Sequence, residues 1–224
     1  MNEVVENTRE LYNESLSSKG FDIFKRGFDI IVSLIGILIT ILILILVKII
    51  YIIKGDIYPI ILKQKRIGLN GELFDLYKIR TMIPNAEEYL LNTLLKENKE
   101  IREEYLKNKK IANDPRITEV GKILRKLSID EFPQFLNVLK GEMAVIGPRP
   151  YLPYEKEDMG ECYEDIIKVK PGITGPWQVS GRNNISFDKR IQIDKTYSQN
   201  KSFKTDFNIF LKTFSTVLSK KGAK

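Results

Sequence analysis

The most prominent pattern in the sequence is an apolar run from Phe28 to Ile53, whose only charged residues are Asp29 and Lys48. This run is long enough to cross a bilayer core of about 30 Å. A buried core helix is the alternative, but the segment 41–47 is apolar on every side, and a domain of this size could hardly surround it. The pattern therefore predicts a membrane-inserted helix over residues 25–57.

The segment before the apolar run, residues 1–24, is predicted to be a polar leader. It is not typical of a secretory signal peptide, which begins with a short basic region, because it carries several carboxylates. These acidic residues are Glu3, Glu6, Glu10, Glu14 and Asp22.

Basic residues lie at both ends of the apolar run, with Lys25 and Arg26 before it and Lys54 after it. Because basic flanks favour the cytoplasmic side, a straight span would violate this preference at one end. We therefore expect a re-entrant helix that enters and leaves on one face. Its return requires a break, for which Gly36 and Thr40 are candidates, since the Thr40 hydroxyl can bond to the carbonyl group four residues earlier.

Downstream of the run, two short alternating segments, 60–67 and 73–79, predict a β-hairpin. Asn70-Gly71 lies between them, and Asn-Gly is a strong hairpin signal. A polar helix is expected over 85–110, and a strand over 166–170.

Three further helices are predicted in this region. One covers 118–127, and the next starts at the Asp130-Glu131 pair and closes at Gly141. The tail 203–218 is amphipathic, which fits either an interfacial helix on anionic lipid or packing onto the core. The whole pattern predicts a mainly helical α+β protein, in which residues 58–224 form a cytosolic, membrane-associated helical catalytic domain with interfacial amphipathic helices.

Composition restricts the chemistry that such a domain can perform. The 224-residue chain contains no histidine and one cysteine, Cys162. Histidine-based nucleophile pairs, histidine general bases and most zinc sites are therefore excluded. The net charge of +7 favours an anionic partner, such as a nucleotide, an acidic membrane or nucleic acid. A nucleic-acid-binding domain is disfavoured, because no binding module is recognisable and the aromatic residues do not interleave with the basic ones.

The adjacent carboxylates of Asp130 and Glu131 are the leading candidates for chemistry. Ser128 and Glu131 match a capping box, so the pair can be explained as a helix cap. However, Pro133 is tolerated only in a first turn, which puts the pair beside free backbone N–H groups that suit phosphate. A carboxylate among cations can stay ionised and act as a nucleophile or a metal ligand.

Several other residues are candidates for substrate binding, because guanidinium and ammonium groups bind phosphate and an aromatic ring can stack on a base. Trp177 is alternatively a core or membrane-interface residue. These candidates are Lys78, Arg80, Arg125, Arg149, Trp177, Gln178 and Arg182, of which Lys78 and Arg80 are alternatively an ordinary exposed strand pair.

From about Lys25 to the C-terminus, an ordered series of motifs resembles the bacterial sugar transferase family, the monotopic phosphoglycosyl transferases. The motifs are Lys25-Arg-Gly-Phe-Asp29, Gln64-Lys-Arg-Ile-Gly-Leu-Asn-Gly71, Tyr77-Lys-Ile-Arg-Thr-Met82, Asn113-Asp-Pro-Arg-Ile-Thr118, the segment from Leu124 to Gln134, Asn137-Val-Leu-Lys-Gly141, Gly147-Pro-Arg-Pro150, Lys170-Pro-Gly-Ile-Thr-Gly175 and Trp177-Gln-Val-Ser-Gly-Arg182. The family usually breaks its membrane helix at Ser-Pro, where this chain has Thr40-Ile41, and Pro176 stands where a non-proline residue is expected.

The resemblance implies a ping-pong reaction at the bacterial inner membrane, on its cytoplasmic face. Asp130 would attack a UDP-sugar, release UMP and carry the phosphosugar, galactose or glucose 1-phosphate by preference, to undecaprenyl phosphate. Glu131 would assist, both carboxylates would hold Mg²⁺, and the cationic candidates would contact phosphate. This is the first membrane step of exopolysaccharide, capsule or O-antigen synthesis. A membrane-anchored scaffold without catalysis is the alternative, and a homodimer is compatible with the sequence.

Overall fold

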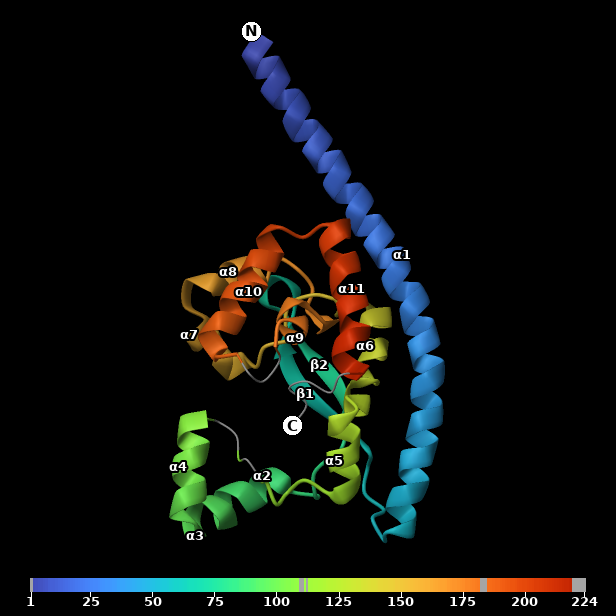
Figure 1. The fold of residues 1–224 in the computed structure, drawn as a ribbon, viewed down its shortest axis with the longest axis vertical. Helices are drawn as coiled ribbons and strands as arrows, with labels where there is room; N and C mark the ends of the chain where they lie inside the picture. Colours follow the sequence, from blue (N-terminus) through green and yellow to red (C-terminus); the bar gives the residue numbers. More distant parts are fainter. Residues whose placement is uncertain (1, 109–110, 112, 182–184, 219–224) are drawn as a thin grey trace.

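The computed structural model of the chain describes residues 2–108, 111, 113–181 and 185–218. Within these residues the protein is mainly helical and has two small two-stranded sheets (Figure 1). The elements are α1 (Asn2–Ile53), β1 (Ile61–Ile67), β2 (Leu73–Ile79), α2 (Ala86–Tyr89), α3 (Leu95–Glu97), α4 (Lys99–Asn108), α5 (Glu119–Lys126), α6 (Gln134–Lys140), β3 (Ala144–Ile146), α7 (Lys156–Met159), α8 (Tyr163–Ile166), β4 (Gly172–Thr174), α9 (Pro176–Val179), α10 (Phe187–Gln199) and α11 (Phe203–Leu218).

The predicted hairpin is confirmed. β1 and β2 are antiparallel, with Ile61 opposite Ile79 and Ile67 opposite Leu73. The connection is a 3₁₀ turn in which Asn70 and Gly71 both have positive φ angles, of 54° and 81°. These are the residue types that tolerate a left-handed backbone, so the local sequence specifies this turn.

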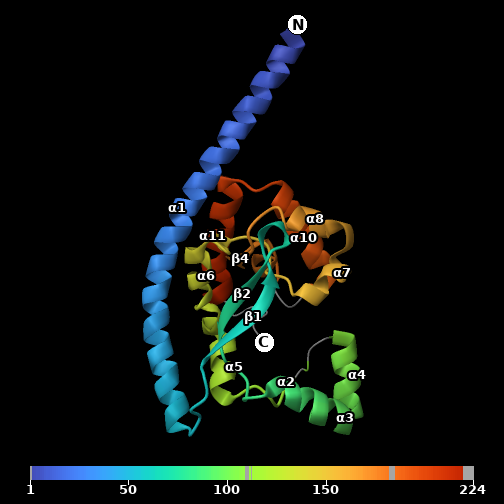
Figure 2. The ribbon, with the colours of Figure 1, turned by 180° about the vertical axis from the view of Figure 1, so that it is seen from behind.

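The C-terminal half of α1 runs alongside the other elements and its N-terminal half extends beyond them, as Figures 1 and 2 show from opposite sides. Near its middle the carboxylate of Asp29 accepts a 2.8 Å hydrogen bond from the backbone N–H of Val145. Arg26 donates to the carbonyl groups at the end of α6, and Lys25 forms an ion pair with Asp206 of α11. At the C-terminal end of the helix, the hydroxyl of Tyr51 donates to the carbonyl oxygen of Arg80 at 2.8 Å.

Helix α1 buries its polar side and exposes its apolar side, whereas an amphipathic helix of a soluble protein does the opposite. Its polar residues Asp29, Ser33 and Thr40 are buried against the domain. Its outward side consists of exposed large apolar residues, namely Ile31, Leu34, Ile35, Leu38, Ile39, Ile41, Leu42, Ile45, Leu46, Ile49, Ile52 and Ile53. From Gly20 to Ile53 the helix is long and apolar enough to cross a membrane. Such an exposed apolar face is typical of contact with lipid.

The expected break in this helix is absent. The Thr40 hydroxyl does donate to the Gly36 carbonyl at 2.7 Å, but α1 continues through both residues to Ile53. A side-chain bond to a carbonyl oxygen can be made in addition to the backbone ladder, so it bends a helix without ending it. The ring of Phe135 lies against Gly36, where a Cβ atom would be 2.4 Å from it.

Two other expectations are wrong in detail. The helix expected over 85–110 is divided at Asn98, whose backbone is extended and whose side chain accepts from the N–H of Ile101, thereby capping α4. The strand expected over 166–170 is the end of α8 and a turn. The strand β4 lies instead in the following loop and pairs in parallel with β3.

Three apolar clusters hold the domain together around these elements. One lies between the hairpin, α6, β3, α10 and α11, and includes Leu76, Val138 and Ile209. A second lies between β1, α8 and α10, and includes Ile67, Ile166 and Ile191. Another lies where α1 and α5 meet the end of β2, around Tyr51 and Ile79. Helix α11 begins and ends as predicted, with Ile209 in the core and Phe203, Phe207, Leu211 and Phe214 exposed.

Candidate active site

Asp130 and Glu131 lie in a short 3₁₀ turn, Ile129–Glu131, between α5 and α6. The predicted capping box does not form, because Ser128 is left-handed at φ 56° and its side chain makes no capping bond. The α-helix begins only at Gln134, with Pro133 at its N-cap position. The carboxylates thus lie in the first turn of this 3₁₀ helix, ahead of α6, and cationic side chains surround them.

Lys78 on β2 contacts both carboxylates. Its Nζ atom is 3.7 Å from Oδ2 of Asp130 and 3.6 Å from Oε1 of Glu131. Asp130 is buried, and this burial raises the pKa of its carboxyl group above the usual value. Lys78 and Arg125 act in the opposite direction and favour the ionised form, whereas the charge of Glu131 adds to the upward shift. The turn thus presents a desolvated carboxylate beside a fixed cation.

Arg125, on the last turn of α5, is the second cation of this group. Its Nε atom donates to the Thr81 hydroxyl at 2.9 Å, which fixes the guanidinium near the turn. Burial lowers the pKa of Arg125, and the charge of Asp130 partly restores it. The guanidinium remains charged, since an arginine pKa lies far above neutrality.

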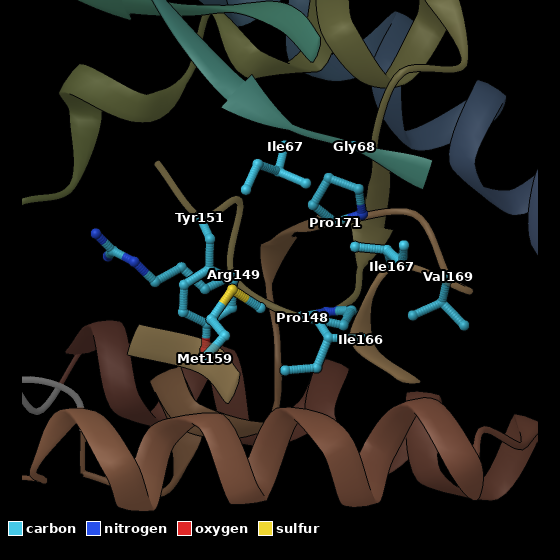
Figure 3. A pocket seen from close by; sticks show the side chains of 10 residues that line it. All are labelled: Ile67, Gly68, Pro148, Arg149, Tyr151, Met159, Ile166, Ile167, Val169 and Pro171. Carbon is cyan, nitrogen blue, oxygen red and sulfur yellow. The ribbon is translucent and has the colours of Figure 1, made fainter. Parts of the chain in front are cut away.

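Arg149 extends from the Gly147–Pro150 loop, which Asp194 of α10 holds in place. One carboxylate oxygen of Asp194 accepts from the Arg149 backbone N–H at 3.0 Å and from the Tyr151 hydroxyl at 2.8 Å. Figure 3 shows Pro148 and Tyr151 packed with Ile67 and Ile166 around a small cavity of about 10 Å³, while the Arg149 guanidinium points away from this cluster. The loop is therefore rigid and directs one cation outward.

Two further arginines, which the sequence analysis did not select, lie close to Arg149. Arg66 is buried at the end of β1, and its pKa falls to about 10 because of this burial and the nearby charge of Arg149. The pKa of Arg190 on α10 is lowered for the same two reasons. Arg66 belongs to the Gln64–Gly71 motif, but a single basic residue in a predicted strand does not by itself indicate a binding site. No feature of the sequence around Arg190 indicated a role in binding.

We call Arg66, Arg149 and Arg190 the arginine cluster. Each of them has a buried Nε atom without a hydrogen-bond partner. Buried N–H donors are normally satisfied, and guanidinium groups that repel one another are stabilised by an anion. The arginine cluster therefore has the properties of an anion-binding site.

Trp177 and Gln178 of α9 adjoin this cluster. The Cζ atoms of Arg190 and Arg149 lie 4.5 and 5.6 Å from the centre of the Trp177 ring, and the residue is 9 % exposed. This burial agrees with the core position expected for Trp177, and stacking on a base stays a prediction. Gln178 donates to the Ile173 carbonyl at 3.4 Å and leaves its own side-chain oxygen without a partner.

One cavity of about 760 Å³ joins the carboxylate turn to Arg66 and Arg149 of the arginine cluster. Its size is in the range of small-molecule sites. The predicted site residues that line it are Lys78, Arg125, Asp130, Glu131, Arg149, Trp177 and Gln178. Arg182 lies outside the described residues.

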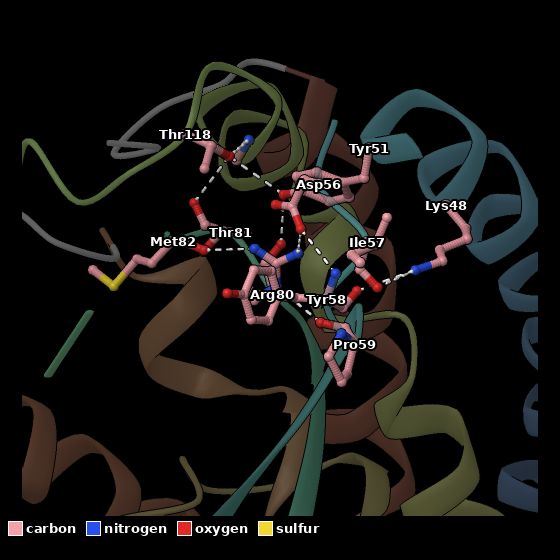
Figure 4. Close-up of polar contacts among 11 residues, drawn as sticks. Lys48, Tyr51, Asp56, Ile57, Tyr58, Pro59, Arg80, Thr81, Met82 and Thr118 are labelled. Atoms are coloured by element: carbon pink, nitrogen blue, oxygen red, sulfur yellow. Dashed lines mark hydrogen bonds and ion pairs between the residues drawn. The ribbon is translucent and has the colours of Figure 1, made fainter. Parts of the chain in front are cut away.

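Arg80 is the one described candidate that does not line the cavity. It is 4 % exposed, and its three nitrogen atoms donate to the carbonyl groups of Pro59 and Met82 and to the Asp56 carboxylate (Figure 4). The guanidinium also lies 4.8 Å from the ring centre of Tyr51. Its nitrogen atoms join the end of the hairpin to the segment that follows α1, which gives Arg80 a structural position, and binding of substrate phosphate by Arg80 stays a prediction.

Replacing Arg80 with glutamine is expected to reduce stability while leaving catalysis by the folded protein nearly unchanged. The change removes the donors of three hydrogen bonds and one partner of an ion pair, so we expect a loss of about 2–3 kcal/mol. For a chain of this length that corresponds to a decrease in Tm of roughly 5–10 °C, measurable by thermal unfolding in detergent. The exposed Lys122→Gln on α5 serves as the control. A normal Tm combined with a large rise in KM for substrate would show that Arg80 does bind phosphate.

Asp130 and Glu131 also fit a magnesium ion. Among the described residues no group of three or more acidic, cysteine or histidine side chains surrounds a metal position. Mg²⁺, however, is commonly held by one or two carboxylates together with substrate phosphates and water. Two adjacent carboxylates in a cavity that also contains an anion site match that set of donors.

Comparison with known proteins gives the family of this chain. The model of the bacterial sugar transferase family matches residues 21–220. The chain belongs to this family.

Three relatives show the range of similarity. The chain is 43 % identical over 173 residues to the undecaprenyl-phosphate galactose phosphotransferase of Salmonella typhimurium, covering 77 % of this chain and 36 % of that protein. It is 42 % identical over 164 residues to the exopolysaccharide production protein ExoY of Sinorhizobium fredii, covering 73 % and 72 %. The UDP-glucose:undecaprenyl-phosphate glucose-1-phosphate transferase of Escherichia coli is 33 % identical over 171 residues, covering 72 % and 33 %. The chain thus matches about a third of the longer relatives and most of ExoY.

Proposed function

We propose that this protein transfers a sugar 1-phosphate from a UDP-sugar to undecaprenyl phosphate, through a covalent intermediate on Asp130. The observation that carries the proposal is the buried carboxylate of Asp130, held beside Lys78 in a cavity that Arg66 and Arg149 of the arginine cluster also line. A carboxylate nucleophile needs an electrophilic phosphorus whose charge is offset, and the surrounding cations supply that environment. The names of the relatives favour galactose or glucose as the sugar.

In the first half-reaction, an Asp130 oxygen attacks the phosphorus that carries the sugar. The bond from this phosphorus to the oxygen of UMP breaks, UMP leaves with the electron pair, and an aspartyl phosphosugar forms. Lys78 and Arg125 stabilise the charge that develops on the phosphoryl oxygens, and the arginine cluster holds the UMP phosphate. Burial of Asp130 removes water that would otherwise solvate the nucleophile.

In the second half-reaction, a phosphate oxygen of the acceptor attacks the same phosphorus. The bond to Asp130 breaks, the carboxylate is restored, and undecaprenyl diphosphate sugar is released. Glu131 lies beside Asp130 and contacts Lys78, so it holds the Lys78 ammonium group in position to bind the incoming phosphate. Asp130 and Glu131 would hold Mg²⁺, which when bound neutralises the charge of the diphosphate.

UMP release from the detergent-solubilised protein tests this function. The protein is incubated with magnesium, undecaprenyl phosphate and separate UDP-sugars, and UMP is measured. Release with one or two UDP-hexoses supports the transferase. No release with any UDP-sugar would instead favour the membrane-anchored scaffold.

We also infer that α1 lies along the cytoplasmic face of the bacterial inner membrane and does not cross it. From Asp29 to Tyr51 its polar side is bonded to the domain, a length of about 33 Å at 1.5 Å per residue. That length equals the bilayer core, so a transverse α1 would draw the polar domain into hydrocarbon. With the apolar side in one leaflet and the polar side on the domain, both basic flanks stay on one face, as the positive-inside rule favours.

Labelling of single cysteines tests this topology. On a Cys162→Ser background, Ser18→Cys and Ile57→Cys place thiols before and after the apolar run. Because both ends remain on one side, a membrane-impermeant maleimide is expected to label both in inverted vesicles and neither in right-side-out cells. Labelling of the two positions from opposite sides would show that α1 spans the membrane.

A further inference from the structure

The cavity that contains Asp130 is lined in part by apolar side chains, and we call this part its apolar end. Besides the charged residues, the lining includes Val32 of α1, Phe135 of α6 and Phe210 and Phe214 of α11. These side chains carry no charge and no hydrogen-bonding group. A sugar nucleotide, which is polar throughout, makes no use of such a surface.

The apolar end is formed by aromatic packing between three helices. The Phe135 ring packs directly on Gly36 of α1, so closely that a Cβ atom at Gly36 would overlap the ring. Phe210 contacts Phe28 of α1 edge to face at 5.5 Å, and it contacts Phe214 at 4.9 Å. The hydroxyl of Thr213 is bonded to that of Thr174 at 2.8 Å, which fixes this turn of α11 over the cavity.

The same helices carry the exposed apolar surface of the molecule. Phe214 lines the cavity and is nevertheless 56 % exposed, so it stands at the opening. Next to it on α11, Leu211 and Phe207 are also exposed, and α1 presents its row of isoleucines and leucines outward. The cavity is therefore continuous from a cationic end to an apolar surface of the kind that lipid covers.

We propose that this end of the cavity, lined by Phe135, Phe210 and Phe214, binds the first isoprenoid units of the lipid phosphate acceptor. This inference rests on the proposed function, and it identifies the residues that select the acceptor. A ligand with an anionic head and a hydrocarbon tail matches both ends at once, with the phosphate at Lys78 and Arg125 and the tail leaving past Phe214 into the membrane. The donor occupies the charged end alone.

Phe214→Ser and Phe207→Ser form a matched pair for testing this assignment. Both residues lie on α11 and have similar exposure, 56 % and 52 %, but only Phe214 lines the cavity. For Phe214→Ser we expect the KM for undecaprenyl phosphate to rise about tenfold, the factor that about 1.4 kcal/mol of lost apolar contact represents. Isotope exchange between UDP-sugar and UMP, which needs no acceptor, is expected to stay within about twofold of wild type for both variants. Phe207→Ser in detergent should leave the KM for the acceptor unchanged.

Binding without turnover gives an independent reading. Trp177 is the only tryptophan of the chain and lines the same cavity, so its fluorescence reports undecaprenyl phosphate added in detergent micelles. The dissociation constant should rise in Phe214→Ser by the same factor as the KM, and it should not change in Phe207→Ser. Equal effects of the two variants, or an unchanged affinity in Phe214→Ser, would overturn the proposal. If the affinity falls only in Phe214→Ser while the wild type shows no UMP exchange, the lipid site stands and the proposed reaction on Asp130 fails.

Discussion

Asp130→Asn is expected to reduce UMP release from the UDP-sugar by at least about a thousandfold, because an amide lacks the charge and nucleophilicity of a carboxylate. Asn has the same shape and can keep the 3₁₀ turn intact. The change also removes a buried charge whose desolvation is unfavourable, so Tm is not expected to decrease. UMP release in the presence of magnesium and acceptor is the measurement.

Asp75→Asn is the matched control for this variant. Asp75 lies on β2 close in sequence to Lys78, but its carboxylate is 38 % exposed and pairs with Lys65 at 2.9 Å. It has no place in the cavity, and the activity of this variant should equal that of wild type. If Asp130→Asn were as active as Asp75→Asn, Asp130 would not be the nucleophile, although membership of the family would be unaffected.

Arg149→Gln is expected to lower kcat/KM for the UDP-sugar about a hundredfold, the usual effect of removing one donor that stabilises a developing negative charge. Unlike Arg80→Gln, this variant is expected to keep nearly the stability of the wild type. The Arg149 side chain has a long 4.0 Å contact with Glu155 and lies 5.6 Å from the centre of the Trp177 ring, and it repels Arg66 and Arg190. Removing it relieves this repulsion, so Tm is expected to stay within about 3 °C of wild type.

Arg149→Lys separates charge from geometry in this position. A lysine keeps the positive charge but cannot donate two parallel hydrogen bonds to a phosphate. We therefore expect a kcat/KM between those of wild type and Arg149→Gln. A kcat/KM for Arg149→Gln within about threefold of wild type would remove the arginine cluster from the substrate site.

Elements with local signals were predictable from the sequence. The Asn70-Gly71 turn fixes the hairpin, and Thr118 caps α5 by accepting from the N–H of Gly121. The strands β3 and β4 were not predicted. Each strand has only three residues, which is too short to show the alternation of apolar and polar residues that predicts a strand. Their parallel pairing also joins segments far apart in the chain.

The two cations of the Tyr77–Met82 motif show why the candidate site was only partly predictable. Lys78 and Arg80 are two residues apart, which in an extended strand would place them on one face. The strand ends at Ile79, however, and Arg80 is drawn toward Asp56 and Tyr51 from another part of the chain. The arginine cluster was missed for a related reason. Arg190 lies beside Trp177, a residue that lines the cavity, because α10 packs against α9, and this contact has no local signal in the sequence.

The mass of the intact protein after exposure to UDP-sugar and magnesium, without acceptor, tests the central claim most directly. We predict that an acid-quenched sample gains the mass of one hexose phosphate, located on the peptide that contains Asp130 and absent from Asp130→Asn. Adding undecaprenyl phosphate before the quench should remove the added mass. UMP release without any covalent adduct, or an adduct on another residue, would contradict the assignment of Asp130 as the residue that carries the phosphosugar.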